Sequence, residues 1–155
     1  MHAVLAVLIT IIPNANDGRW TAVYRLAQPV ERVDFARTGP YTGLPKWRVE
    51  TKGYSLVQDG TREAIVKSPS AKAQKTIAVS FPVDTSVPIK DYQLFDAFSD
   101  GTLALYTGHF NLRGAKTTTF ELAPRRHEHL LVGGKVFAHR TRWIDDGAGE
   151  GTFVY

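Results

Sequence analysis

The triplet His127-Glu128-His129 is the first candidate in this chain for metal chemistry. On a β-strand, residues two apart project to the same face, so the two imidazoles could ligate a metal ion together with His109 or His139. A metal site also needs a convergent third ligand held by ordered partners, and the arginines near the triplet oppose a bound cation. We therefore interpret the triplet as part of a solvated basic strand and predict no metal site in the chain.

The motifs of common catalytic centres are missing from the sequence. His127-Glu128 begins an HExxH pattern, but Leu131 stands where the second histidine is required. GxSxG, the Walker loop and GxGxxG are also absent, and the glycine-rich residues 147–151 precede an apolar run rather than a helix. Cysteine does not occur, which excludes disulfides, thiolate zinc sites and a cysteine nucleophile. We predict no catalytic residue and no cofactor in this chain.

Positive charge is gathered in one part of the sequence, although the formal net charge is only +4. Between Arg113 and Arg142 the acidic residues are Glu121 and Glu128 alone. Such a strip suits phosphate, an acidic partner or anionic lipid, or it is simply the solvated face of a sheet, and we predict no nucleic-acid binding from charge alone. Together with aromatic side chains that could stack on a ligand, it suggests a binding surface. The candidate binding residues are Tyr106, His109, Arg125, Arg126 and Trp143.

Residues 1–17 contain a segment with two possible roles. The run Ala3 to Ile12 is apolar apart from Thr10, and Pro13 and a polar stretch follow it. Its length matches the apolar part of a signal peptide, although no lysine or arginine precedes it, and it is too short to span a bilayer. It equally fits a buried first strand. A signal peptide predicts a periplasmic or secreted protein, and in either case we predict no stable membrane insertion.

Turn-forming dipeptides divide the chain into short apolar runs, which predicts an all-β fold. Asp100-Gly101, Asp59-Gly60 and Gly133-Gly134 each join two such runs, and no stretch without glycine or proline exceeds 12 residues, which leaves little room for long helices. Residues 18–155 are therefore expected to form a single antiparallel β-sandwich built from hairpins. The chain stops directly after the apolar run Phe153-Val154-Tyr155, so we expect it to be a fragment of a longer protein.

The hairpins also allow register predictions. A two-residue loop at Asp100-Gly101 sets Phe95 opposite Tyr106, whereas a three-residue loop from Ser99 to Gly101 sets Phe95 opposite Leu105. We predict the first register because it pairs aromatic with aromatic side chains. At Asp59-Gly60 the same reasoning sets Tyr54 opposite Ile65.

Several of these segments together resemble a known family. They are the amino-terminal apolar run, Tyr24-Arg25-Leu26, Val33-Asp34-Phe35, Trp47-Arg48-Val49, Phe98-Ser99-Asp100-Gly101 and Tyr106-Thr107-Gly108-His109-Phe110. They are similar to the amino-terminal β domain of bacterial metallopeptidases related to the glycyl aminopeptidase and aminopeptidase N group, the gluzincins. In that family the zinc ligands and general base belong to a following domain, so the resemblance implies zinc only downstream of this chain.

The resemblance implies a non-catalytic accessory domain that shapes the peptidase cleft and braces the catalytic domain. Its partners would be the downstream peptidase domain and the peptide substrate. The alternative is an independent periplasmic or secreted β-sandwich module that binds carbohydrate, peptide or an acidic partner through aromatic and basic side chains.

Overall fold

The computed structural model describes residues 6–14, 18–37, 46–60, 62–85, 94–145 and 153–154. It confirms the all-β class, and the described residues contain no long helix. Helix η2 (Thr107–Phe110) is one short 3-10 turn. The strands are β1 (Ala6–Ile12), β2 (Arg19–Val30), β3 (Arg32–Asp34), β4 (Arg48–Val49), β5 (Tyr54–Asp59), β6 (Arg62–Lys67), β7 (Gln74–Pro82), β8 (Phe95–Ala97), β9 (Leu103–Tyr106), β10 (Thr117–Leu122), β11 (Leu130–Val132), β12 (Lys135–Phe137), β13 (Thr141–Asp145) and β14 (Phe153–Val154).

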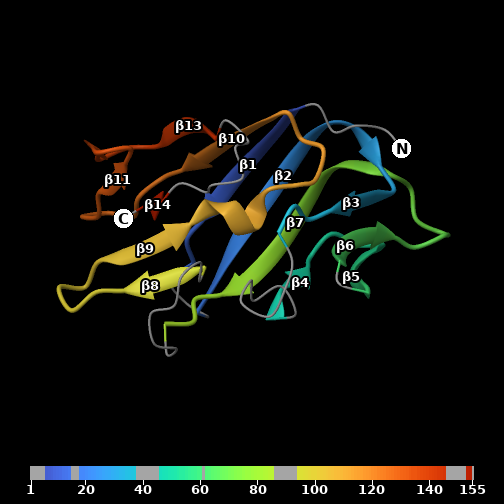
Figure 1. Ribbon diagram of the computed structural model, residues 1–155, viewed down its shortest axis with the longest axis horizontal. Coiled ribbons are helices and arrows are strands. Elements are labelled where there is room, and N and C mark those ends of the chain that lie inside the picture. The colour runs from blue at the N-terminus through green and yellow to red at the C-terminus, as the bar shows by residue number, and fades with distance from the viewer. Residues whose placement is uncertain are drawn as a thin grey trace.

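The largest sheet has six strands in the order β13-β10-β1-β2-β7-β4 (Figure 1). Strand β1 lies between β2, to which it is antiparallel, and β10, to which it is parallel. The sequence did not predict this parallel pair, because it joins segments from opposite halves of the chain. The apolar run of residues 6–12 is thus an interior strand of the largest sheet.

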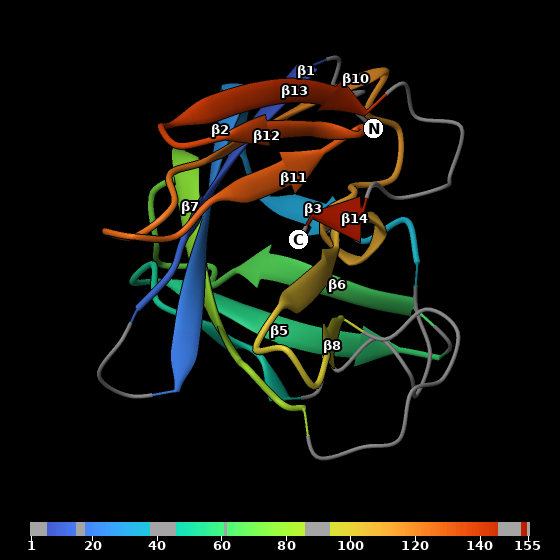
Figure 2. The same ribbon diagram turned by 90° about the vertical axis from the view of Figure 1, so that its left-hand side faces the viewer.

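Two smaller sheets complete the described fold. Five strands form the order β12-β11-β14-β9-β8, and three form β3-β6-β5. In Figure 2 the strands of both smaller sheets cross beside the long strands β1, β2 and β7. The carboxyl-terminal strand β14 pairs with both β9 and β11 and so joins two hairpins into one sheet.

Inward-facing and outward-facing residues alternate along the strands, and the inward-facing ones form one core between these sheets. Val7, Ile9 and Ile11 of β1 are buried on the inner face, as are the alternating residues of β2, β7 and β10. Aromatic side chains fill the space between the sheets: Phe81 of β7 stacks on Phe95 of β8 with ring centroids 5.9 Å apart. Buried aromatic pairs of this kind add specific geometry to the burial of apolar area.

The β8–β9 hairpin has the register that we did not predict. Phe95 pairs with Leu105 rather than Tyr106. The loop is closed by Phe98, whose N–H donates to the Thr102 carbonyl (2.9 Å), and Gly101 has φ +90°. This is the three-residue loop in which glycine takes the left-handed position. The Asp100 carboxylate accepts a hydrogen bond from the Thr102 N–H (2.9 Å), which stabilises that turn.

Of the other two hairpins, one has the predicted turn and the other does not. Val132 pairs with Lys135 across Gly133-Gly134, both of which have positive φ, so that predicted turn is confirmed. In the β5–β6 hairpin Asp59 pairs with Arg62, so the turn lies one residue later than predicted and Tyr54 faces Lys67 rather than Ile65. The shift puts Leu56 opposite the buried Ile65.

Within the described ranges, no helix has the length and apolar character needed to cross a membrane. Residues 38–45, whose glycine and proline content predicts a loop, and residues 147–151, whose glycines predict a turn, lie outside the described residues.

Candidate functional site

A cleft of about 400 Å³ opens at the end of β10, between the largest sheet and the five-stranded sheet. Its walls are mainly apolar and come from distant parts of the chain. They include Trp20 of β2, Leu103 of β9, Leu122 of β10, Leu130 and Leu131 of β11, and Val136 of β12. The volume falls in the range of about 300–1,000 Å³ that is usual for ligand pockets, and the predominance of apolar lining is also typical of them.

Arg125, Glu128 and His129 are polar or charged residues that line this cleft. The first two are held in a tight turn that follows β10. The Arg125 N–H donates to the Glu128 carboxylate (2.9 Å), and the Glu128 N–H donates back to the Arg125 carbonyl (2.9 Å). The Arg125 Nε–H also donates to Glu128 Oε1 (2.8 Å), which lowers the pKa of Glu128 from its usual value. Both side chains are therefore charged at neutral pH and fixed in position.

The backbone of this turn explains the role of His127. Its φ of 68° is the only positive value at a non-glycine residue among those described. A positive φ at the third residue of a four-residue turn belongs to a type II turn, which normally takes glycine or asparagine there. His127 is therefore a turn residue, and the interpretation of the triplet as part of a strand was wrong, because it lies between β10 and β11. The described part of the chain holds no group of three histidines, aspartates or glutamates able to bind a metal.

The five sequence-predicted binding residues fall in three separate places. Arg125 lines the cleft, and Arg126 is exposed in the same turn. Tyr106 and His109 are both about 98% buried and pack edge to face with centroids 5.1 Å apart, while Arg37 covers the Tyr106 ring at 5.5 Å. Trp143 is partly buried and stacks on the core residue Phe120, with ring centroids 5.7 Å apart. The structure does not bring these five residues to one surface.

The sequence analysis did not identify the leucines of the cleft as candidate binding residues. Leucines at alternating strand positions look like core residues, and only tertiary structure shows which of them border an opening. Val136 is the middle residue of a short strand and is 67% exposed. A single exposed apolar residue is ordinary, so no local pattern in the sequence marked the cleft.

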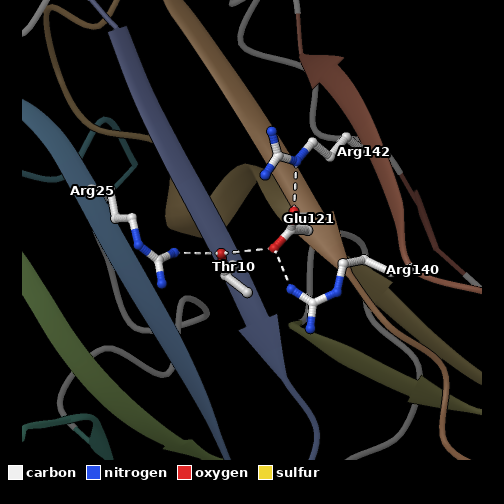
Figure 3. A network of polar contacts seen from close by, with 5 residues as sticks. All are labelled: Thr10, Arg25, Glu121, Arg140 and Arg142. Carbon is white, nitrogen blue, oxygen red and sulfur yellow. Dashed lines mark hydrogen bonds and ion pairs between the residues drawn. The ribbon is translucent and has the colours of Figure 1, made fainter.

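A second polar feature lies on the outer face of the largest sheet (Figure 3). Glu121 of β10 has a side chain only 6% exposed, and it accepts hydrogen bonds from Arg142 Nε and from Arg140 Nη1 (2.9 Å). Thr10 of β1 donates to the same carboxylate (3.4 Å) and accepts from Arg25 of β2 (2.8 Å). The hydrogen bond from Arg142 comes first among the causes that lower the pKa of Glu121, and the charges of Arg142 and Arg140 and the hydrogen bond from Arg140 add to it, whereas burial of the carboxylate opposes them. We refer to these five residues as the Glu121 network.

No known protein-family model matches this sequence, and no curated protein sequence matches it. The relationship to metallopeptidases therefore stays a prediction.

Proposed function

We propose that this domain binds peptides by seating an apolar side chain in the cleft beside β10. The observation that carries the proposal is the cleft itself, an apolar opening of about 400 Å³ beside a fixed pair of opposite charges. Burial of one large aliphatic or aromatic side chain contributes about 1.5–3 kcal/mol, which is a useful anchor for a peptide.

The lining favours a peptide over a carbohydrate. Sugars are held by aromatic platforms and by many hydrogen bonds, whereas Trp20 is the only tryptophan, tyrosine or phenylalanine among the described lining residues. The leucines of β9, β10 and β11 instead suit an aliphatic or aromatic side chain. Arg125 and Glu128 present both charge signs, which fits the donors and acceptors of a peptide backbone better than the single charge of a fatty acid.

This function is compatible with both interpretations of the sequence. An accessory domain of a zinc metallopeptidase would use such a cleft to select peptides, and an independent module would use it to hold a partner. The accessory role, like a periplasmic or secreted location, remains a proposal based on the resemblance and on the amino-terminal run. Sequencing the gene beyond Tyr155 tests it: a following domain with HExxH and a later glutamate ligand supports the accessory role, and a stop codon contradicts it.

Binding is tested with short, soluble peptides that differ only in a central leucine, phenylalanine or serine. We expect the leucine or phenylalanine peptide to bind and the serine peptide to bind at least about tenfold more weakly, equivalent to about 1.4 kcal/mol. Val136→Lys should remove that preference. Ile144→Lys is the matched control, because Ile144 has the same exposure of 67% but lies on β13, whereas Val136 lines the cleft. Equal binding of all three peptides, or equal effects of the two substitutions, would refute the proposal.

A further inference from the structure

The outer face of the largest sheet carries apolar side chains among its polar ones. In the pairing of β1, β2, β10 and β13, the residues on the side of Thr10 and Glu121 include Leu8, Ile12, Val23 and Ile144. Ile12 is 45% exposed and Ile144 is 67% exposed. An antiparallel or mixed sheet with one solvated face normally alternates apolar and polar residues, whereas a strand covered on both faces is apolar throughout. The sequence of β1, AVLITII, has the second pattern.

The arginines of the Glu121 network lie on this same face. Arg140 and Arg142 have side chains 65% and 64% exposed, and Arg25 is also exposed. Among the described contacts each guanidinium uses one of its three nitrogens in a hydrogen bond: Arg25 to Thr10, and Arg140 and Arg142 to Glu121. Each guanidinium has five N–H groups, and most of them are therefore available to bind carboxylates.

The charge of the face selects among possible occupants. Three arginines surround one glutamate in the network, so two copies of this face would repel each other. Membrane-binding patches usually combine about four to eight lysines or arginines, and a carboxylate at the centre of this cluster would be repelled by anionic headgroups. A protein surface that carries both apolar and acidic side chains complements the face in both respects.

We propose that the outer face of the β13-β10-β1-β2 sheet is a docking surface for an acidic amphipathic helix of a partner protein or domain. The apolar stripe of the helix covers Ile12 and Ile144, and its carboxylates bind Arg25, Arg140 and Arg142. A sheet with an apolar face is commonly buried against a helix, and arginine is enriched at protein interfaces. This surface is separate from the cleft and does not depend on the peptide-binding function.

The test uses two synthetic helical peptides of about 18 residues, about 27 Å long, with the same leucine stripe flanked by glutamates in one and by lysines in the other. We expect the glutamate peptide to bind the full chain and the lysine peptide to bind at least about tenfold more weakly. Ile144→Lys should weaken binding of the glutamate peptide about tenfold or more, because it places a charge under the leucine stripe. Val136→Lys, in the cleft, should leave binding of this peptide unchanged. Arg25→Ala should weaken binding and reduce its dependence on salt.

Several results would overturn the proposal. They are the absence of binding by the glutamate peptide, equal binding of the two peptides, and equal effects of Ile144→Lys and Val136→Lys. Vesicles of phosphatidylserine and phosphatidylcholine provide a further arm: binding that Ile144→Lys abolishes would assign the face to a membrane instead. A dimer in solution that Ile144→Lys dissociates would assign it to a second copy of the chain. Thermal unfolding of each variant verifies that it is folded.

Discussion

The hydroxyl of Thr10 donates a hydrogen bond to the carboxylate of Glu121, which is 111 residues later in the chain (3.4 Å). The contact exists because β1 and β10 run parallel with these two residues in register. Arg142 of β13 lies opposite Glu121 on the other side of β10. One buried carboxylate therefore joins three neighbouring strands of the largest sheet.

The pKa of Glu121 makes this junction sensitive to acid. A carboxylate whose pKa is lowered by folding contributes stability that is complete above its unfolded pKa of about 4.3 and is lost as the pH falls through the folded pKa. We predict that Glu121→Gln lowers the free energy of unfolding by about 1–2 kcal/mol at about pH 7 and by less at about pH 3, because the stability contributed by the ionised carboxylate decreases as the pH falls below its unfolded pKa. Chemical denaturation at both pH values measures the difference.

The matched control for this prediction is Glu128→Gln. That carboxylate is 41% exposed and pairs with an arginine 45% exposed, so its loss should cost about 0.5 kcal/mol or less. Equal costs for the two substitutions, or a cost at Glu121 that does not change with pH, would contradict the interpretation of Glu121 as a buried junction.

Two phenylalanines of the β8–β9 hairpin differ in burial, so we expect their substitutions to have different effects on stability. Phe95 is 2% exposed and packs against Trp20 (5.1 Å) and Phe81, whereas Phe98 is 43% exposed. We predict that Phe95→Ala destabilises the domain by about 3–5 kcal/mol through the cavity it leaves. Phe98→Ala should change the free energy of unfolding by no more than about 0.5 kcal/mol, because substitutions at the surface rarely change stability. Thermal or urea unfolding measures both costs, and a cost at Phe98 as large as that at Phe95 would contradict the burial of Phe95 and the exposure of Phe98.

The three hairpins show how far sequence alone can specify the fold. Gly133-Gly134 identified its turn correctly, because two adjacent glycines with positive φ fit a two-residue loop. Asp100-Gly101 is compatible with two loop lengths, and the choice depends on the Asp100 carboxylate binding the Thr102 N–H and on the burial of Phe95. The positions of the strands could therefore be predicted from the sequence. The register of a hairpin could not, because it depends on which side chains the core buries.

The candidate site was harder to predict for a related reason. Arg125 was found because charge gathers near it, but Tyr106 and His109 were proposed for binding on residue type and are buried. The cleft is formed by segments as distant as Trp20 and Val136, and the Glu121 network by strands from both ends of the chain. No local pattern contains such long-range neighbours.

The interior position of β1 predicts what happens when residues 1–12 are removed. Their loss deprives both β2 and β10 of a pairing strand and leaves the core without Val7, Ile9 and Ile11. We predict that a chain beginning at Pro13 fails to unfold cooperatively, as followed by near-ultraviolet circular dichroism. Ile12→Thr is the control and should stay within about 0.5 kcal/mol, because that side chain is 45% exposed. A stable truncated chain would instead support removal of this segment as a signal peptide.

The hydroxyl of Tyr54 joins β5 to the irregular end of the β2–β7 pair. It donates to the Val30 carbonyl (2.6 Å) and accepts from the Gln74 N–H (2.8 Å), where the register of β2 and β7 shifts. We predict that Tyr54→Phe destabilises the domain by about 1–3 kcal/mol, because it removes both hydrogen bonds while the ring remains. Tyr24→Phe, which removes one bond to the Phe110 carbonyl (3.0 Å), should cost less.

Amide hydrogen exchange distinguishes this local role of Tyr54 from a general loss of stability. The Gln74 amide should lose protection in Tyr54→Phe by more than the change in global stability explains, whereas in Tyr24→Phe its protection should fall only with global stability. Unchanged protection of Gln74 in Tyr54→Phe would mean that the strand pairing holds this end of the sheet without the tyrosine.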